Sequence, residues 1–459
     1  MNEGVESNAG TLELLPNEIL SRCFFFTITD FDPGGHDKNI KNLRLVSKRC
    51  HNVASDFLIV STRVYLASHS LKRLEYLSDH PIFSKSVKRV ELNLSYYDSL
   101  LASDLSCFAD ACSTDLDSLV DRYAHFGGRK STRDISTVFS AWNKVSSGEF
   151  SQVEANPKQR FLFDAHEEYR RRWGDQEEVK REEAHITKIR KALSKFTNLK
   201  SICIEDKART RSGYGTFTRS TGRENEKNPE PSQKEKFKEH EVSSDNWKSP
   251  WDKWDFATSV DYMRFLSISK LNAYDLQFLF GDVVLMRMCL SPSRWKGGLT
   301  TAFKTKPPFE FLPQFFKALE GTPVRPVNFE IKITPPNDLR CLQLTDTEKE
   351  SIHKVLEKSK NVACIIARWA RKDSNAEDNS RPRSEMLALC SLTSALFCSW
   401  EIRSLYISFD EYPASNEKPL VSIGDILPLR PWRSLEEAKF RNIPMTVGGI
   451  ENFVTVGSF

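Results

Sequence analysis

The stretch Ile402-Arg403-Ser404-Leu405-Tyr406-Ile407 carries an aliphatic residue at its first, fourth and sixth positions. The last two aliphatics stand two residues apart, which is typical of a short strand with one buried face. The leading aliphatic, three residues earlier, is expected to pack at the turn that enters the strand. The same pattern occurs at four other places: Val87-x-x-Val90-x-Leu92, Leu199-x-x-Ile202-x-Ile204, Leu339-x-x-Leu342-x-Leu344 and Leu435-x-x-Ala438-x-Phe440. Five copies of one pattern predict a repeated strand-forming unit.

This pattern resembles the strand core of a leucine-rich repeat. The spacing is irregular, however, because residues 339 and 402 are 63 apart and residues 402 and 435 are 33 apart, against about 20–29 in a regular repeat. The usual Asn three positions after the last aliphatic is also missing, since Ile443 stands there with Asn442 one residue early. We therefore expect an α/β fold: a degenerate, leucine-rich-repeat-like solenoid with helical insertions.

Residues between the buried aliphatics are expected to point outward along one face of the strands. Their mixed charge is compatible with a surface that binds a protein, and equally with ordinary solvated strand residues. They are Glu91, Asn93, Cys203, Glu205, Gln343, Tyr406, Ser408, Lys439 and Arg441.

Composition limits the class of protein. The chain has 459 residues, 39% of them hydrophobic, with 66 Lys and Arg against 62 Asp and Glu. A net charge of only +4 argues against a dedicated nucleic-acid binder. No secretory signal opens the chain and no run of about 18 apolar residues interrupts it, so we expect neither export nor a membrane span. The expected compartment is the cytosol, the nucleus or both.

The cysteines form no C-x-x-C pair, and most lie within apolar stretches. We expect them to be buried, reduced thiols of an intracellular protein. The ten are Cys23, Cys50, Cys107, Cys112, Cys203, Cys289, Cys341, Cys364, Cys390 and Cys398.

The chain divides into five regions by composition. We predict a disordered amino terminus over residues 1–11, a compact module over 12–60, and a first helix and strand region over 61–206. Residues 207–254 are polar and charged, which predicts a disordered insertion, and residues 255–459 form a second repeat-like region. Within the first region, residues 150–196 are expected to form one long helix whose broken apolar stripe leaves a coiled-coil seam as an alternative.

Trp247, Trp251 and Trp254 end the polar insertion, interleaved with Lys248 and Lys253. Such a cluster can be a stacking platform for nucleic acid. Without a wider basic patch, the reading that we favour is that these tryptophans anchor the insertion to the folded domain.

The module over residues 12–60 contains three predicted helices. Pro16 suits the start of the first, because proline lacks a backbone donor, and Ile19, Leu20, Cys23 and Phe24 form its apolar stripe. Ile40, Leu43 and Val46 mark a second helix. Ser47 is expected to cap a third, which carries Cys50, Val53, Ala54 and Phe57 inward. So small a domain with surplus aliphatics usually completes its burial against a partner.

Leu14-Leu15-Pro16 with Glu18-Ile19-Leu20, followed by Leu43-Arg44-Leu45-Val46-Ser47-Lys48-Arg49, resembles the F-box, and the F-box proteins of fungi in particular. The resemblance covers about a tenth of the chain. One departure from the family is the loop Thr27–Lys38, which is longer and richer in glycine than usual.

The resemblance implies docking to the Skp-family adaptor of an SCF-type cullin-RING ubiquitin ligase, and through it to a cullin. The residues that would form the docking surface are Leu14, Leu15, Pro16, Glu18, Ile19, Leu20, Leu43 and Val46. The alternative is that these residues only pack a small helical bundle. If later segments of the same chain enclosed them, no partner surface would remain.

The sequence carries no familiar catalytic or cofactor motif. Phosphate-binding glycine loops and the G-x-S-x-G elbow are missing, and His166-Glu167-Glu168 is followed by Arg170 where a zinc helix needs a second His. We therefore expect a non-catalytic adaptor with no cofactor, which holds an unknown protein substrate. The alternatives are an F-box scaffold without a ubiquitination substrate, and an enzyme whose site the sequence does not reveal.

Overall fold

The computed structural model describes a large part of the chain. The described residues are 14–29, 36–124, 132–149, 155–181, 184–206, 289–290, 309–334, 338–366, 383–409, 423–427, 430–441, 443 and 447–456. The predictions for residues 1–11, the polar insertion 207–254 and its three tryptophans lie outside these ranges, as do residues 30–35. The predicted loop Thr27–Lys38 is too long, because residues 27–29 end one helix and residues 36–38 begin the next. Within the described ranges, no helix has both the length and the apolar character that a bilayer crossing requires.

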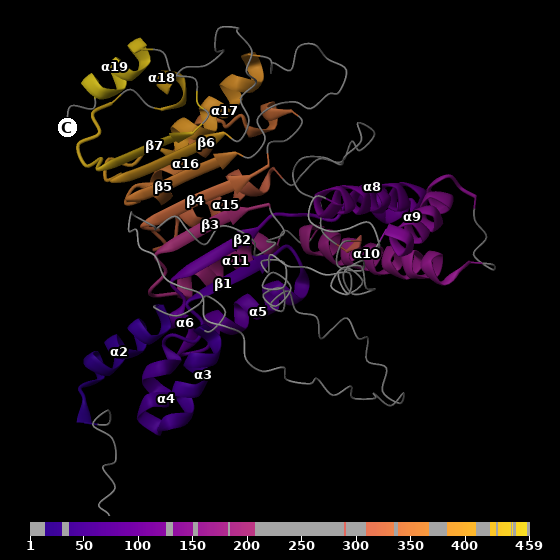
Figure 1. The fold of residues 1–459 in the computed structure, drawn as a ribbon. Helices are drawn as coiled ribbons and strands as arrows, with labels where there is room; N and C mark the ends of the chain where they lie inside the picture. The colour runs from indigo at the N-terminus through magenta and orange to yellow at the C-terminus, as the bar shows by residue number, and fades with distance from the viewer. Residues whose placement is uncertain are drawn as a thin grey trace, which may run out of the picture.

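A seven-stranded parallel sheet organises the molecule (Figure 1). Each strand pairs only with its neighbours in chain order, so the spatial order of the seven strands equals their order in the chain. This arrangement confirms the predicted α/β class. The strands are β1 (Ser61–Tyr65), β2 (Arg89–Asn93), β3 (Ser201–Glu205), β4 (Asn328–Ile333), β5 (Asn361–Ile366), β6 (Ser404–Phe409) and β7 (Glu437–Arg441).

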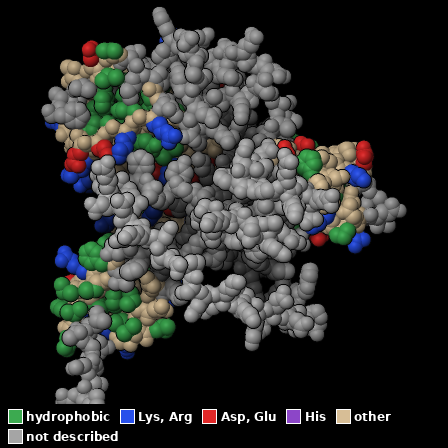
Figure 2. Space-filling model, in the orientation of Figure 1, with side chains coloured by type: hydrophobic (Ala, Val, Ile, Leu, Met, Phe, Trp, Pro, Cys, Tyr) green, Lys and Arg blue, Asp and Glu red, His purple; other side chains and the backbone are tan. Residues whose placement is uncertain are grey.

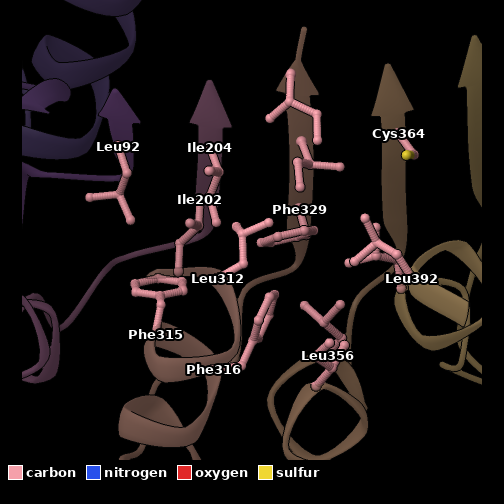
Figure 3. Close-up of a cluster of buried hydrophobic side chains, with 14 of the residues drawn as sticks. Leu92, Ile202, Ile204, Leu312, Phe315, Phe316, Phe329, Leu356, Cys364 and Leu392 are labelled. Atoms are coloured by element: carbon pink, nitrogen blue, oxygen red, sulfur yellow. The ribbon is translucent and has the colours of Figure 1, made fainter. Parts of the chain in front are cut away.

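Helices pack against one face of this sheet and close the main core. Figure 3 shows Phe315 and Phe316 of one helix beneath Ile202 and Phe329 of the strands, and all four side chains are buried. Burial of such aromatic side chains contributes about 1.5–3 kcal/mol each. The helices around this core are α5 (Ser68–Asp79), α6 (Phe83–Ser86), α11 (Ala184–Lys195), α15 (Phe311–Glu320), α16 (Asp346–Leu356), α17 (Arg383–Leu396), α18 (Ile423–Ile426) and α19 (Val447–Val456).

Four of the five predicted strands are confirmed, as β2, β3, β6 and β7. The fifth is wrong, because Leu339–Leu342 is a 3-10 helix, whose Leu339 and Leu342 are both buried. The true strand of that region, β4, lies earlier. In the parallel register, Val90, Ile202, Phe329, Val362 and Leu405 are successive partners across the sheet.

The register shows why the sequences of β4 and β5 do not match the aliphatic pattern. Three residues before Phe329 and Val362 stand Pro326 and Ser359, where the pattern requires an aliphatic residue. Both are buried, and the hydroxyl of Ser359 donates a hydrogen bond of 2.7 Å to the carbonyl of Pro326. One leading position therefore stacks on the next by a hydrogen bond rather than by aliphatic contact. β1 was missed in the same way, because Thr62 stands where the pattern requires an aliphatic residue.

A second core lies in the helices between β2 and β3, which extend away from the sheet in Figure 1. The helices are α7 (Ser99–Ser103), α8 (Leu105–Ala124), α9 (Thr132–Ser146) and α10 (Pro157–Arg181). Phe108, Trp142, Leu162 and Tyr169 are among the buried side chains of this core. Cys289 and Leu290, from the much later connection between β3 and β4, are buried in the same core.

The helix predicted over residues 150–196 begins later than expected, because residues 155 and 156 are not helical. The described residues of this region form α10 and α11, whose apolar side chains are divided between two cores. Leu162 and Tyr169 of α10 belong to the core of the helical bundle, whereas Ile189 and Leu193 of α11 belong to the core under the sheet. Val179, still on α10, already belongs to the core under the sheet, so the change from one core to the other falls within α10, between Trp173 and Val179.

The cysteines are free thiols in the structure. Six of them are buried, as expected: Cys50, Cys112, Cys203, Cys289, Cys364 and Cys390. The expectation is wrong for Cys23 and Cys341, which are exposed.

Candidate partner-binding surface

Three helices form the amino-terminal module: α2 (Asn17–Thr29), α3 (His36–Val46) and α4 (Lys48–Ser55). As predicted, Ser47 caps α4, because its hydroxyl accepts a hydrogen bond of 3.1 Å from the backbone N–H of Cys50. The module has a small core of its own. Its buried members are Leu20, Phe24, Ile40, Cys50, Ala54 and Phe57.

Helix α2 is apolar on two sides. Leu20 and Phe24, four residues apart, face the core and are 0% and 2% exposed. Ile19 and Phe26 leave that face and are 41% and 58% exposed. The small core therefore uses only one of the two apolar stripes of α2.

The end of α3 adds more exposed apolar surface. Leu45 is 84% exposed and Val46 is 64% exposed, and Leu14, just before α2, is 84% exposed. Figure 2 shows hydrophobic side chains gathered over this module. We call the exposed set Leu14, Ile19, Phe25, Phe26, Leu45 and Val46 the apolar docking face. Clustered apolar surface of this kind marks an interaction site more often than a solvated face.

Polar contacts hold the start of α2 against α4. The Arg49 Nε donates a hydrogen bond of 2.9 Å to the Asn17 side chain, and its terminal nitrogen donates to the carbonyl of Leu15. The carbonyl of Pro16 accepts the backbone N–H of Leu20 at 3.0 Å. The apolar docking face is therefore held on ordered backbone.

The predicted docking residues separate into three groups by burial. Leu14, Pro16, Glu18, Ile19 and Val46 are exposed, and Leu15 and Leu43 are half-buried. Leu20 is wholly enclosed by the module's own core, so its assignment to the docking surface is corrected.

Leu45, Phe25 and Phe26 also lie on this surface, although they were not among the predicted docking residues. A signal was present, because a single helix cannot turn the neighbouring apolar positions 45 and 46, or 24 to 26, all toward one core.

Across β1 to β4, the strand face turned away from the aliphatic core carries a chain of ion pairs. Arg63 is 2.9 Å from Glu91, Arg89 is 3.0 Å from Glu91 and 2.9 Å from Glu330, and Lys332 is 2.6 Å from Glu330. Although burial favours the neutral acid, Lys332 and Arg89 hold the pKa of Glu330 below its usual range. The charges of this face thus largely satisfy one another.

Several residues predicted to point outward for target recognition are instead buried. Asn93 is 0% exposed, and its side-chain oxygen accepts hydrogen bonds from the N–H and the hydroxyl of Ser95. Glu91, Cys203, Glu205 and Ser408 are buried as well. Gln343 is exposed but follows the 3-10 helix instead of lying on a strand. Tyr406 and Lys439 are half-buried, and Arg441 is exposed, as predicted.

No group of three or more His, Cys, Asp or Glu side chains in the described ranges is arranged to hold a metal ion. Comparison of the chain with family models, with curated proteins and with solved structures finds no match. The apolar docking face and the strand face are thus the two candidate functional surfaces of the described residues.

Proposed function

We propose that this chain is the substrate-recognition subunit of an SCF-type cullin-RING ubiquitin ligase. The module over residues 12–60 docks the Skp-family adaptor, and the repeat region holds the target protein. One observation carries the proposal: α2 has a second apolar stripe that its own core leaves exposed, continued by Leu45 and Val46 of α3. The resemblance of Leu14–Leu20 and Leu43–Arg49 to the F-box names the partner that would cover it.

We further propose that the sheet is a degenerate leucine-rich-repeat-like solenoid. Support comes from strands that follow chain order in one parallel sheet, with each strand entered through a leading position. Counted with Pro326 and Ser359, the leading positions 326, 359, 402 and 435 are 33, 43 and 33 residues apart. This spacing is more even than the aliphatic pattern alone suggests, and it supports stacked units in which each contacts its neighbours.

The mechanism requires no chemistry from this chain. An adaptor that binds a ligase at one end and a target at the other raises the target's effective concentration near the transfer enzyme. On this proposal, target contacts fall to strand-face residues that keep some solvent exposure, such as Tyr406. The cytosol and the nucleus are the compartments that suit this role.

Binding to a purified Skp-family adaptor tests the docking assignment. We expect Ile19→Asp combined with Leu45→Asp to weaken binding at least about 100-fold, because each change puts a charge into an apolar interface centre. Both side chains are exposed, so the pair leaves the module's core intact. Leu15→Asp is less suitable, because Leu15 is half-buried beside the Arg49 contact.

Leu387→Asp is the matched control, since Leu387 is an exposed leucine on α17, away from the module. It should bind the adaptor like the wild type. Unchanged binding by the Ile19 and Leu45 variant would show that the docking assignment is wrong. A second measurement distinguishes a substrate receptor from a scaffold: deletion of the gene should make a particular protein accumulate only if the chain is a substrate receptor.

A further inference from the structure

The last strand, β7, has one free edge among the described strands, because it pairs only with β6. The N–H of Glu437 donates a hydrogen bond of 2.9 Å to the carbonyl of Arg403, so the backbone of residue 437 faces β6. Backbone groups alternate along a strand. The N–H and C=O groups of Ala438 and Phe440 therefore point away from β6, toward the open edge.

The sequence of this edge is complementary to itself. Glu437, Lys439 and Arg441 alternate with Ala438 and Phe440, so the three charged side chains share the face opposite the aliphatic core. An antiparallel copy centred on Lys439 places Glu437 opposite Arg441 of the partner subunit, twice by symmetry. It also places Ala438 opposite Phe440 of the partner subunit, which pairs the outward backbone groups with each other.

The charges of β7 favour this antiparallel pairing over an in-register parallel one. Protected edge strands commonly carry lysines or other charges that repel a second strand. Here a parallel partner would face like charge with like, whereas an antiparallel partner faces opposite charges at both ends. The central Lys439, which would face its own copy, lies 2.6 Å from Glu437 of its own strand, and that carboxylate offsets its charge.

Apolar surface lies beside the same edge. Helix α19 packs against β7 through Phe453, whose ring centroid is 5.6 Å from that of Phe440. On α19, Val447 is 75% exposed and Ile450 is 44% exposed, and Ala438 of the strand is exposed as well. Figure 2 shows hydrophobic side chains gathered among charged ones at this end of the molecule.

We propose that β7 is a self-association edge, at which a second copy of this chain pairs antiparallel about a twofold axis through Lys439. The partner is a second copy because an edge whose charges match its own reversed sequence satisfies the symmetry of an isologous dimer. A five-residue strand pair buries less than the roughly 1,200 Å² of a stable interface. The dimer is therefore weak and depends on protein concentration.

Sedimentation equilibrium of the full chain over a concentration series tests the proposal. Glu437→Arg and Arg441→Glu each place like charges opposite one another at both ends of the strand pair. Each should raise the dimer dissociation constant about tenfold, since two cross-strand pairs change from attraction to repulsion. The double variant Glu437→Arg with Arg441→Glu restores opposite charges and should recover the wild-type constant.

Lys358→Glu is the matched control, because it makes the same charge change as Arg441→Glu at an exposed lysine outside β7, and it should leave the constant unchanged. A chain that stays monomeric at every concentration overturns the proposal. A dimer whose constant ignores the single variants, or is not recovered by the double variant, overturns it equally. The adaptor-docking module lies beyond the β1 end of the sheet, so adaptor binding by these variants reports on the proposed function separately (Figure 1).

Discussion

At the scale of single residues, Arg430 shows how one side chain closes the end of a helix. Its guanidinium lies 4.8 Å from the ring centroid of Trp400 and 4.5 Å from that of Trp432. The same group donates hydrogen bonds to the carbonyls of Phe397 and Ser399, at 2.7 and 2.5 Å, just after α17 ends. Burial lowers the pKa of Arg430. The carbonyls at this helix end thus gain a cationic partner.

We expect Arg430→Ala to lower the free energy of unfolding by at least about 2 kcal/mol, because it removes several hydrogen bonds from buried carbonyls along with the ring contacts. Arg430→Lys should lose nearly as much, since an ammonium group cannot donate along a planar fork. Urea denaturation followed by circular dichroism measures both.

Arg340→Ala is the control for Arg430, because Arg340 is an exposed arginine that pairs with Asp338. Its loss should lower the free energy of unfolding far less than the loss of Arg430, because an ion pair in solvent contributes little. Equal losses for Arg430→Ala and Arg340→Ala would show that the helix-end contacts contribute little.

At the scale of elements, α16 shows how strongly a local signal sets a helix start. The backbone N–H of Glu348 donates to the Thr345 hydroxyl at 3.3 Å, and the Thr345 N–H donates to the Glu348 carboxylate at 2.7 Å. This reciprocal capping box satisfies two backbone donors at the amino end of the helix. Ile352, Val355 and Leu356 then turn toward the main core.

Thr345→Ala should destabilise the chain by about 1 kcal/mol, since the helix loses its cap. Thr345→Ser keeps the hydroxyl and should stay close to wild type. Hydrogen exchange in the first turn of α16 locates the effect. Faster exchange spread evenly over the whole chain would contradict a local capping role.

At the scale of the whole molecule, the two larger cores are separate from each other and from the small core of the amino-terminal module. One lies between the sheet and its helices, and the other lies inside the bundle of α8, α9 and α10. Trp142 is wholly buried in the bundle, where its ring N–H donates a hydrogen bond of 3.2 Å to the carbonyl of Lys158. Separate cores are expected to open separately.

Trp142→Ala should therefore lower the free energy of local unfolding of the bundle by about 3–5 kcal/mol and leave the sheet ordered. Hydrogen exchange is the measurement: amides of α8 to α10 should lose protection while those of β2 to β6 keep theirs. Phe316→Ala, in the main core, should produce the reverse pattern. If both variants reduced protection equally throughout the chain, the two cores would form one cooperative unit.

The sequence alone determined the features that depend on near neighbours. Proline before α2, the Ser47 cap of α4 and the alternating aliphatics of β2, β3, β6 and β7 were readable, because each follows from residues a few positions apart. The surplus of apolar residues in the module was readable too, although Leu20 was wrongly assigned to its surface.

Only the tertiary structure decided which positions are enclosed. Leu339-x-x-Leu342-x-Leu344 matches the strand pattern yet forms a 3-10 helix, while β4 and β5 enter through Pro326 and Ser359. Glu91 and Asn93 have the polarity of surface residues, yet they lie buried among strands from distant parts of the chain. Burial of a residue depends on which distant segments of the chain pack against it, and a local sequence pattern does not contain that information.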